Sequence, residues 1–373
     1  MTPAVPDPGF SLEARGLSAV LGGRKVLDIP SLGIVPGGVL VIIGPNGSGK
    51  TTLLLSLSLL LKPASGDIFY NGHPVSYGNE ALKLRRRFAV LFQEPLLLSG
   101  TVWDNVTLGL RLRHTQKEEI KARAGKWLER FGIAHLASRQ ARSLSGGEAK
   151  RVSLARAFVL EPEVLFLDEP FAALDTPTHQ SLLEDFQTVL HETKISTVMV
   201  THELEEALIL GDRAAVLIKG RIRQTGTPRE VISSPADEEV AAFVKGGNIL
   251  HGRLILRDDG RVFIKVGNQQ IEAAPGPVTA DELAVFLHYD DITISDGRVT
   301  ESGNGTANRF KGIITQLLPL NSQVRLNVAC PFNLTAVVTR RACEELHLEK
   351  GKEVIASFEP AAVRIFKPGT PAL

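Results

Sequence analysis

Short apolar runs alternate with longer stretches of helical character over residues 11 to about 235. Four of these runs are predicted as buried strands: VLVII (39–43), VLFL (164–167), STVMV (196–200) and AAVLI (214–218). The leucine-rich residues 53–61, which follow the first run, predict a helix. Strands separated by helical stretches are typical of an α/β layer on a mostly parallel sheet.

The pattern changes after Pro235, where short alternating stretches are separated by turns such as DDG, GNQ and SDG. This spacing is typical of an all-β structure, and we predict one or two small barrels of the OB kind. We therefore expect two domains, an α/β domain over residues 1–235 and an all-β OB-like barrel over residues 236–373. The likeness of GRLIL to KGIIT hints at an internal repeat.

A glycine-rich loop follows the predicted strand 39–43 and precedes the predicted helix. It consists of Gly44, Pro45, Asn46, Gly47, Ser48, Gly49, Lys50, Thr51 and Thr52. Its glycines let backbone amides close around the β- and γ-phosphates of a nucleotide, Lys50 adds a positive charge, and the Thr51 hydroxyl can ligate Mg²⁺. The loop predicts an α/β P-loop NTPase that binds a nucleoside triphosphate and Mg²⁺, and the family resemblance described below implies that the nucleotide is ATP.

Two carboxylates follow the predicted strand 164–167, in VLFLDEP. Ligands of such sheets bind at the carboxyl ends of the strands. We expect Asp168 to hold Mg²⁺, directly or through water, and Glu169 to orient or deprotonate the attacking water. General-base help of this kind contributes roughly 10²–10⁴-fold.

A second candidate anion site lies at LSGGE, residues 144–148. Ser145, Gly146 and Gly147 precede a helix-favouring run, and backbone amides at a helix start attract anions. The chain thus carries two phosphate cradles, nearly a hundred residues apart.

Together these motifs resemble the ATPase subunits of ABC transporters over nearly all of residues 11–235. The resemblance implies that Gln93, in VLFQEP, contacts both the magnesium and the membrane subunits. It implies that LSGGE is the signature loop, that AALD with Asp175 is the D-loop, and that His202, in VMVTHE, is the switch histidine.

The same resemblance implies a partner for the second cradle. ATPases of this family work as head-to-tail pairs, in which the signature loop of one copy faces the ATP on the phosphate loop of the other. Ser145, Gly146 and Gly147 would therefore contact the γ-phosphate of a second copy's ATP. One residue departs from the importer pattern, because Leu21 stands where an aromatic side chain stacks on adenine, and Phe10 has the wrong spacing to replace it.

Charge and cysteine content bear on the partners of the chain and on the compartment in which it works. Lys plus Arg number 42 against 41 Asp plus Glu, so the net charge of +1 gives no electrostatic reason to expect a nucleic-acid partner. Two cysteines are no disulfide framework, which favours a reducing compartment. The N-terminus lacks a signal-peptide pattern, and the longest apolar stretch is too short to span a bilayer.

Three kinds of ABC protein fit the motifs: an importer ATPase, an exporter ATPase, and a non-transport ABC ATPase. Lys50 and Asp168 are too close in sequence for the long coiled-coil insertion of the third kind, and exporter ATPases are commonly fused to membrane spans. The stretch from His202 to Val231 closely resembles importer subunits. We expect a peripheral subunit at the cytoplasmic face of the membrane, bound to two transmembrane permease subunits and served indirectly by an extracytoplasmic solute-binding protein.

The tail resembles the small oxyanion-binding barrel of molybdate and tungstate systems. Residues that fit its pattern are Asn308, Gly312, Ala336, Thr339, Leu346, Leu348 and Gly351. The resemblance favours a molybdate or tungstate importer, with sulfate, iron, polyamine or sugar import as the alternative. Positions that hold the anion depart from the pattern, at Gly305, Ala307, Ala342 and Glu359. We therefore predict that the tail serves dimerisation and docking and does not sense an oxyanion.

Overall fold

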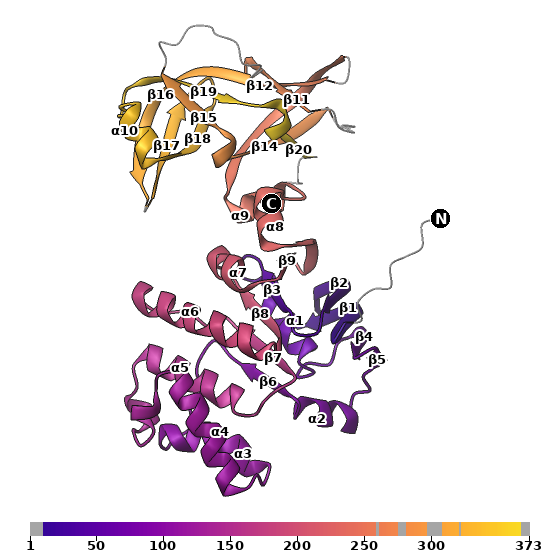
Figure 1. The fold of residues 1–373 in the computed structure, drawn as a ribbon. Coiled ribbons are helices and arrows are strands. Elements are labelled where there is room, and N and C mark those ends of the chain that lie inside the picture. Colours follow the sequence, from indigo (N-terminus) through magenta and orange to yellow (C-terminus); the bar gives the residue numbers. More distant parts are fainter. Residues whose placement is uncertain (1–9, 259–260, 275–280, 297–307, 321, 367–373) are drawn as a thin grey trace. The chain divides into compact units, whose positions relative to one another are not determined.

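The computed structural model describes residues 10–258, 261–274, 281–296, 308–320 and 322–366 (Figure 1). The chain divides into two compact units, Met1–Val231 and Ile232–Leu373. The division falls within α8 (Pro228–Ser233), whereas the sequence pattern placed it after residue 235.

A six-stranded sheet forms the centre of the first unit. Its strands, in spatial order, are β10 (Arg221–Gly226), β9 (Arg213–Ile218), β3 (Val39–Ile43), β8 (Ser196–Thr201), β7 (Val164–Asp168) and β6 (Phe88–Leu91). The strands from β9 to β6 are parallel, and β10 pairs antiparallel with β9. Every residue of β3, β7 and β8 is buried, as expected where both faces of a parallel sheet are covered. The α/β prediction and its four buried strands are confirmed.

A second, antiparallel sheet packs on the same core, and the sequence analysis did not predict it. Its strands, in spatial order, are β2 (Arg24–Ile34), β1 (Leu12–Leu21), β4 (Ser65–Tyr70) and β5 (His73–Pro74). Leu12, Leu17 and Ile29 of this sheet share one apolar cluster with Leu53 of α1 and Ile42 of β3. The phosphate loop is therefore anchored between two sheets.

The first helix is shorter than predicted. The sequence predicted a helix over residues 53–61, but α1 (Lys50–Leu57) ends before Ser58. Leu59 adopts a left-handed backbone conformation, with φ 63°, and its side chain is fully buried. Burial of Leu59 in the core turns the chain out of the helical path, so the prediction was wrong for residues 58–61.

Three helices form a separate region of the first unit, away from the antiparallel sheet (Figure 1). They are α3 (Val102–Leu112), α4 (Lys117–Arg130) and α5 (Gly146–Phe158). Trp127 of α4 stacks within 6.0 Å of Phe131 and lies 4.8 Å from Phe158 of α5, measured between ring centroids. The remaining helices of this unit are α2 (Asn79–Arg85), α6 (Thr176–Thr193) and α7 (Leu204–Leu210).

The second unit is built from strands, as predicted. One sheet has the order β13 (Gln269–Ala273), β12 (Arg261–Val266), β11 (Gly247–Asp258), β14 (Glu282–His288) and β20 (Arg364–Phe366). The other has the order β15 (Thr293–Asp296), β19 (Glu353–Phe358), β16 (Asn308–Pro319), β17 (Gln323–Ala329) and β18 (Asn333–Thr339). Both sheets contribute to a single apolar core. Two short helices accompany them, α9 (Glu238–Val244) and α10 (Arg340–Glu345).

The two sheets of this unit repeat one another. β11 and β16 are each twelve residues long and each is the middle strand of its sheet. Asn248 of β11 bonds the backbone of Thr335, through its amide nitrogen at 2.8 Å and its amide oxygen at 2.7 Å. Asn308 of β16 bonds the backbone of Glu272 in the same two ways, both at 2.8 Å. Each half thus inserts one asparagine into the other half.

Candidate active site

The phosphate loop connects β3 to α1. Gly47 and Gly49 have φ values of 77° and 102°, a region that favours glycine. A Cβ atom on Gly44 would lie 2.1 Å from the carbonyl oxygen of Leu217, so this position also excludes a side chain. The Ser48 hydroxyl is buried and has no protein partner in the described part of the chain. These features fit a backbone cradle for phosphate oxygens.

Lys50 is the first residue of α1 and lies across this loop. Its ammonium donates to the carbonyl oxygens of Gly44 at 2.9 Å and Pro45 at 3.2 Å. Burial lowers the pKa of Lys50, and the charges of Glu169 and Asp168 act in the opposite direction. An ammonium beside a glycine-rich loop is suited to binding a polyphosphate.

Asp168 ends β7 beside Thr51. The Thr51 hydroxyl donates to the Asp168 carboxylate at 3.2 Å, and Asp168 is only 6% exposed. Burial raises the pKa of Asp168, although the Thr51 hydrogen bond opposes the change. A buried carboxylate next to a hydroxyl fits a hard divalent cation, because Mg²⁺ takes oxygen ligands from one or two carboxylates plus substrate phosphates.

Glu169 follows in a left-handed conformation, with φ 42°, and its amide donates to the carbonyl of Val200 at 2.9 Å. His202 lies on the other side, with Nδ1 3.2 Å from Oε1 of Glu169. The second ring nitrogen of His202 lies 3.2 Å from a carboxylate oxygen of Glu203. The His202 ring is therefore held between the carboxylates of Glu169 and Glu203, and it fixes the position of the Glu169 carboxylate.

The parallel sheet brings the predicted residues to one edge. The phosphate loop follows β3, Gln93 follows β6, Asp168 ends β7 and His202 follows β8. Because neighbouring parallel strands end on the same side, these four elements share the carboxyl edge of the sheet. The side chain of Gln93 is exposed there.

The signature loop lies elsewhere in this unit, at the start of α5. Ser145 caps the helix by accepting from the amide of Glu148 at 3.3 Å, and Glu148 accepts in return from the amide of Ser145 at 2.7 Å. Arg139 lies 3.2 Å from the Glu148 carboxylate. The backbone hydrogen bond from Ser145 is the main reason that the pKa of Glu148 lies below its ordinary value.

The signature loop and the D-loop border one cavity of about 560 Å³. Asp175 caps α6 by accepting from the amide of Thr178 at 3.3 Å. A Cβ atom on Gly147 would lie 2.6 Å from Cγ2 of Thr178, so the close approach of the two loops depends on this glycine. Ser145, Gly146, Gly147 and Asp175 all line the cavity, and no residue of the phosphate loop does.

Comparison with known proteins identifies the family. The sequence matches the ABC transporter family over residues 27–172 and the TOBE domain family over residues 306–365. The molybdate/tungstate import ATP-binding protein of Pyrococcus horikoshii is 37% identical over 357 residues, which cover 95% of this chain and 99% of the relative. The chain belongs to the ABC transporter family.

Two other members of the ABC transporter family extend the comparison. The sulfate/thiosulfate import ATP-binding protein of Mycobacterium bovis is 34% identical, over 89% of this chain and 88% of its own. A solved ATP-binding cassette, a dimer in a post-hydrolysis state with ADP and phosphate, superposes with a TM-score of 0.54. It is 27% identical and covers 58% of this chain and 99% of its own.

These comparisons confirm the predicted family, the ABC ATPase fold with a β-rich TOBE domain, and ATP hydrolysis as the activity. No helix in the described ranges is long and apolar enough to cross a membrane. The roles of the single site residues stay predictions.

The sequence analysis missed several buried polar residues around the site. Lys150 of α5 donates to the backbone carbonyl of Gln93. His179 of α6 lies 2.9 Å from the buried carboxylate of Glu206 in α7, so the helix that follows the D-loop is joined to the helix that follows His202. Lys150 and Glu206 lie on buried faces of their helices, and the helical pattern gives no sign of the partner that either residue contacts.

Proposed function

We propose that this chain is the ATP-binding subunit of an importer for molybdate- or tungstate-type oxyanions. The observation that carries the proposal is the similarity to the P. horikoshii molybdate/tungstate import ATP-binding protein. That similarity spans both units of the chain and nearly the whole relative. It therefore includes the TOBE region as well as the ATPase.

In the proposed site the phosphate loop and Lys50 bind the β- and γ-phosphates of ATP. Thr51 and Asp168 hold Mg²⁺ with help from Gln93, and the ion supplies charge stabilisation at the phosphoryl oxygens. Glu169 orients the attacking water and accepts its proton, and His202 keeps the Glu169 carboxylate in place. Their distances of 3.2 Å, from Thr51 to Asp168 and from His202 to Glu169, support these roles.

The proposed functional form is a head-to-tail pair. The cavity beside Ser145 and Asp175 contains no phosphate-loop residue of the same chain, which fits a role in completing the ATP site of a second copy. Hydrolysis then depends on assembly, because each site gains its γ-phosphate donors only when two copies close. The solved cassette is itself dimeric, which supports a pair of copies as the functional form.

The pair would bind two transmembrane permease subunits at the cytoplasmic face of the membrane. An extracytoplasmic solute-binding protein would deliver the anion to the permease. We propose no nucleic-acid partner. Sulfate import is the second candidate, because the M. bovis sulfate/thiosulfate import protein is similar over most of both chains.

Reconstitution tests both candidates. The chain is assembled in proteoliposomes with the permease and binding protein of the same transporter, and ATP hydrolysis is measured with the binding protein loaded with tungstate, molybdate or sulfate. We expect tungstate and molybdate to stimulate hydrolysis and sulfate to have little effect. Stimulation by sulfate alone would replace the proposal with the second candidate, and stimulation by none of the three would exclude both.

A further inference from the structure

The helix that begins at the signature loop also holds the backbone of the Gln93 segment. Lys150, in the second turn of α5, donates from its ammonium to the carbonyl oxygen of Gln93. The side chain is 5% exposed. In the described ranges no carboxylate lies within ion-pair distance of Lys150, so its closest polar contact is this backbone carbonyl.

Two further residues on the same face of α5 continue this contact. Ser153 donates to the carbonyl of Pro95 at 3.1 Å. Arg156 donates to the carbonyl of Pro95 at 2.8 Å and to that of Leu96 at 2.9 Å. Lys150, Ser153 and Arg156 are spaced three residues apart, so they lie along one side of the helix. Residues 93–96 are therefore fastened along α5.

The far end of this segment is fastened to a different helix. Asn105 of α3 is buried and bonds the backbone of Leu98 through both amide atoms, at 2.8 Å and 3.0 Å. Leu96 is the last residue fastened to α5, and it has a left-handed conformation, with φ 43°, and an exposed side chain. The end that bears Gln93 thus depends on Lys150, while the other end depends on Asn105.

An ammonium is costly to bury unless hydrogen bonds compensate. A neutral side chain would fill the same space on α5 without that cost. Two features compensate for burying the charge of Lys150. Its ammonium donates to the carbonyl of Gln93, and the negative charges of Glu169, Glu206 and Asp168 favour the charged form.

We infer that Lys150 is the positioning residue for Gln93. It ties Gln93 to the helix that begins at Ser145, so the signature loop and Gln93 move as one body. When Ser145 closes on the ATP of a second copy, Gln93 is carried with it toward the metal of its own site. One lysine thereby links the two ATP sites of the pair. This inference rests on the proposed roles of Gln93 and Ser145.

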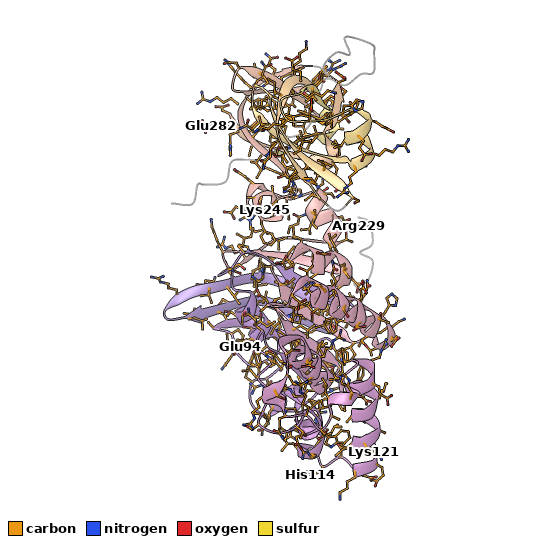
Figure 2. The ribbon with its side chains drawn as sticks, turned by 90° about the vertical axis from the view of Figure 1, so that its left-hand side faces the viewer. Glu94, His114, Lys121, Arg229, Lys245 and Glu282 are labelled. Atoms are coloured by element: carbon orange, nitrogen blue, oxygen red, sulfur yellow. The ribbon has the colours of Figure 1, made fainter. Side chains whose placement is uncertain are left out.

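The test compares three full-length variants. Lys150→Met keeps the length of the side chain and removes the donor. Lys150→Gln keeps a donor without the charge. Lys121→Met is the matched control, because Lys121 lies on an exposed face of α4 at the end of the helical region, near His114 (Figure 2). For each variant kcat, KM for ATP, the Mg²⁺ concentration for half-maximal activity, and amide hydrogen exchange over residues 93–97 are measured.

We expect Lys150→Met to lower kcat by about 10–100-fold, the usual loss when a residue that orients a metal ligand is removed. KM for ATP should change little, because the phosphate loop is untouched, and the Mg²⁺ requirement should rise. Exchange over residues 93–97 should become faster. Lys150→Gln should recover most of kcat and of the exchange protection, and Lys121→Met should match the wild type.

Unchanged exchange and kcat in Lys150→Met would overturn the inference. So would an equal loss of ATP binding, kcat and melting temperature, since that pattern indicates a structural role only. A wild-type protein without ATPase activity would count against the proposed function, whereas the exchange measurement would still decide whether Lys150 holds the Gln93 segment.

Discussion

His202 and Glu169 face one another across the carboxyl edge of the parallel sheet, with Nδ1 3.2 Å from Oε1. Glu169 takes a left-handed backbone conformation to reach this position. Non-glycine residues in that region cost of order 1–3 kcal/mol and cluster at functional sites. The geometry is that of a carboxylate whose direction is fixed before substrate arrives.

The first prediction concerns Glu169→Gln. The amide keeps the shape of the side chain but cannot accept a proton, so turnover should fall by roughly 10²–10⁴-fold. MgATP should still bind, and an ATP-bound dimer should accumulate, because closure precedes hydrolysis. Size-exclusion chromatography with MgATP detects the dimer. Turnover near that of the wild type would remove Glu169 from this role.

The second prediction concerns the shared site. Lys50→Ala removes the cation of the cradle, and Ser145→Arg blocks the contact with the second copy, so each variant alone should be inactive. A mixed pair places both lesions in one site and leaves the other intact, and part of the activity should return. If mixed pairs form and stay inactive, a cysteine near Ser145 is crosslinked to one near Lys50 of the other copy. A crosslink would show that the shared site exists and that the two sites must work together. No crosslink would show that the two copies do not share a site in this way.

The third prediction concerns Leu21, the last residue of β1, which is 46% exposed at a hairpin tip. Base–aromatic stacking contributes roughly 1–3 kcal/mol in nucleic-acid sites. Leu21→Tyr should therefore tighten ATP binding more than binding of tripolyphosphate. Phe10 does not fill this place, because its ring packs on Gly33 of β2. Equal ATP affinity in the variant and the wild type would mean that another group already covers adenine.

The fourth prediction concerns Glu148, whose pKa in the folded chain lies below its ordinary value of 4.5. The charged Glu148 carboxylate stabilises the fold at pH values above the pKa that this carboxyl has in the unfolded chain. This contribution is lost as the pH falls through the pKa of Glu148 in the folded chain. Glu148→Gln keeps the oxygen that accepts from Ser145 but does not titrate. Melting temperatures measured from neutral to acidic pH should therefore fall more steeply for the wild type. Parallel curves would show that the charge of Glu148 is irrelevant.

The fifth prediction concerns the tail. Asn308 is 2% exposed, and both atoms of its amide are bonded to the backbone of Glu272, so this side chain serves the packing of the two halves. Glu359 is exposed at the end of β19, and the amide of Ala342 is bonded to Thr339. Gly305 and Ala307 lie outside the described residues. Calorimetry on the full chain should detect no micromolar binding of molybdate, tungstate or sulfate. Tight binding of any of them would restore an oxyanion sensor.

The sequence predicted those parts of the molecule in which a local pattern determines the structure. The phosphate loop, the strand that ends at Asp168 and the alternating strands of the tail each carry their signal within a few residues. The antiparallel sheet β2-β1-β4-β5 carried no such signal, because its strand lengths are uneven and the pairing of β1 is interrupted by register shifts between Ala19 and Val20 and between Arg15 and Ser18.

Contacts between distant elements could not be predicted in the same way. Lys150 lies in an ordinary helical run, and only the folded chain shows that its ammonium lies against the carbonyl of Gln93. The pair of His179 and Glu206 is equally invisible, because the two residues lie on different helices. The early end of α1 could not be predicted either. A leucine-rich run favours helix, but Leu59 is buried in the core in a left-handed conformation, and this ends the helix.

The exchange of Asn248 and Asn308 between the two halves of the tail is the relation expected between the subunits of a twofold dimer, where each copy offers the other the same group. A duplicated and fused gene would produce this arrangement, with a homodimer as the ancestor. The two halves share this strand arrangement, and the TOBE match covers residues 306–365, which hold most of the second half. Fusion places the two halves under separate selection, and their outer faces are free to acquire different partners.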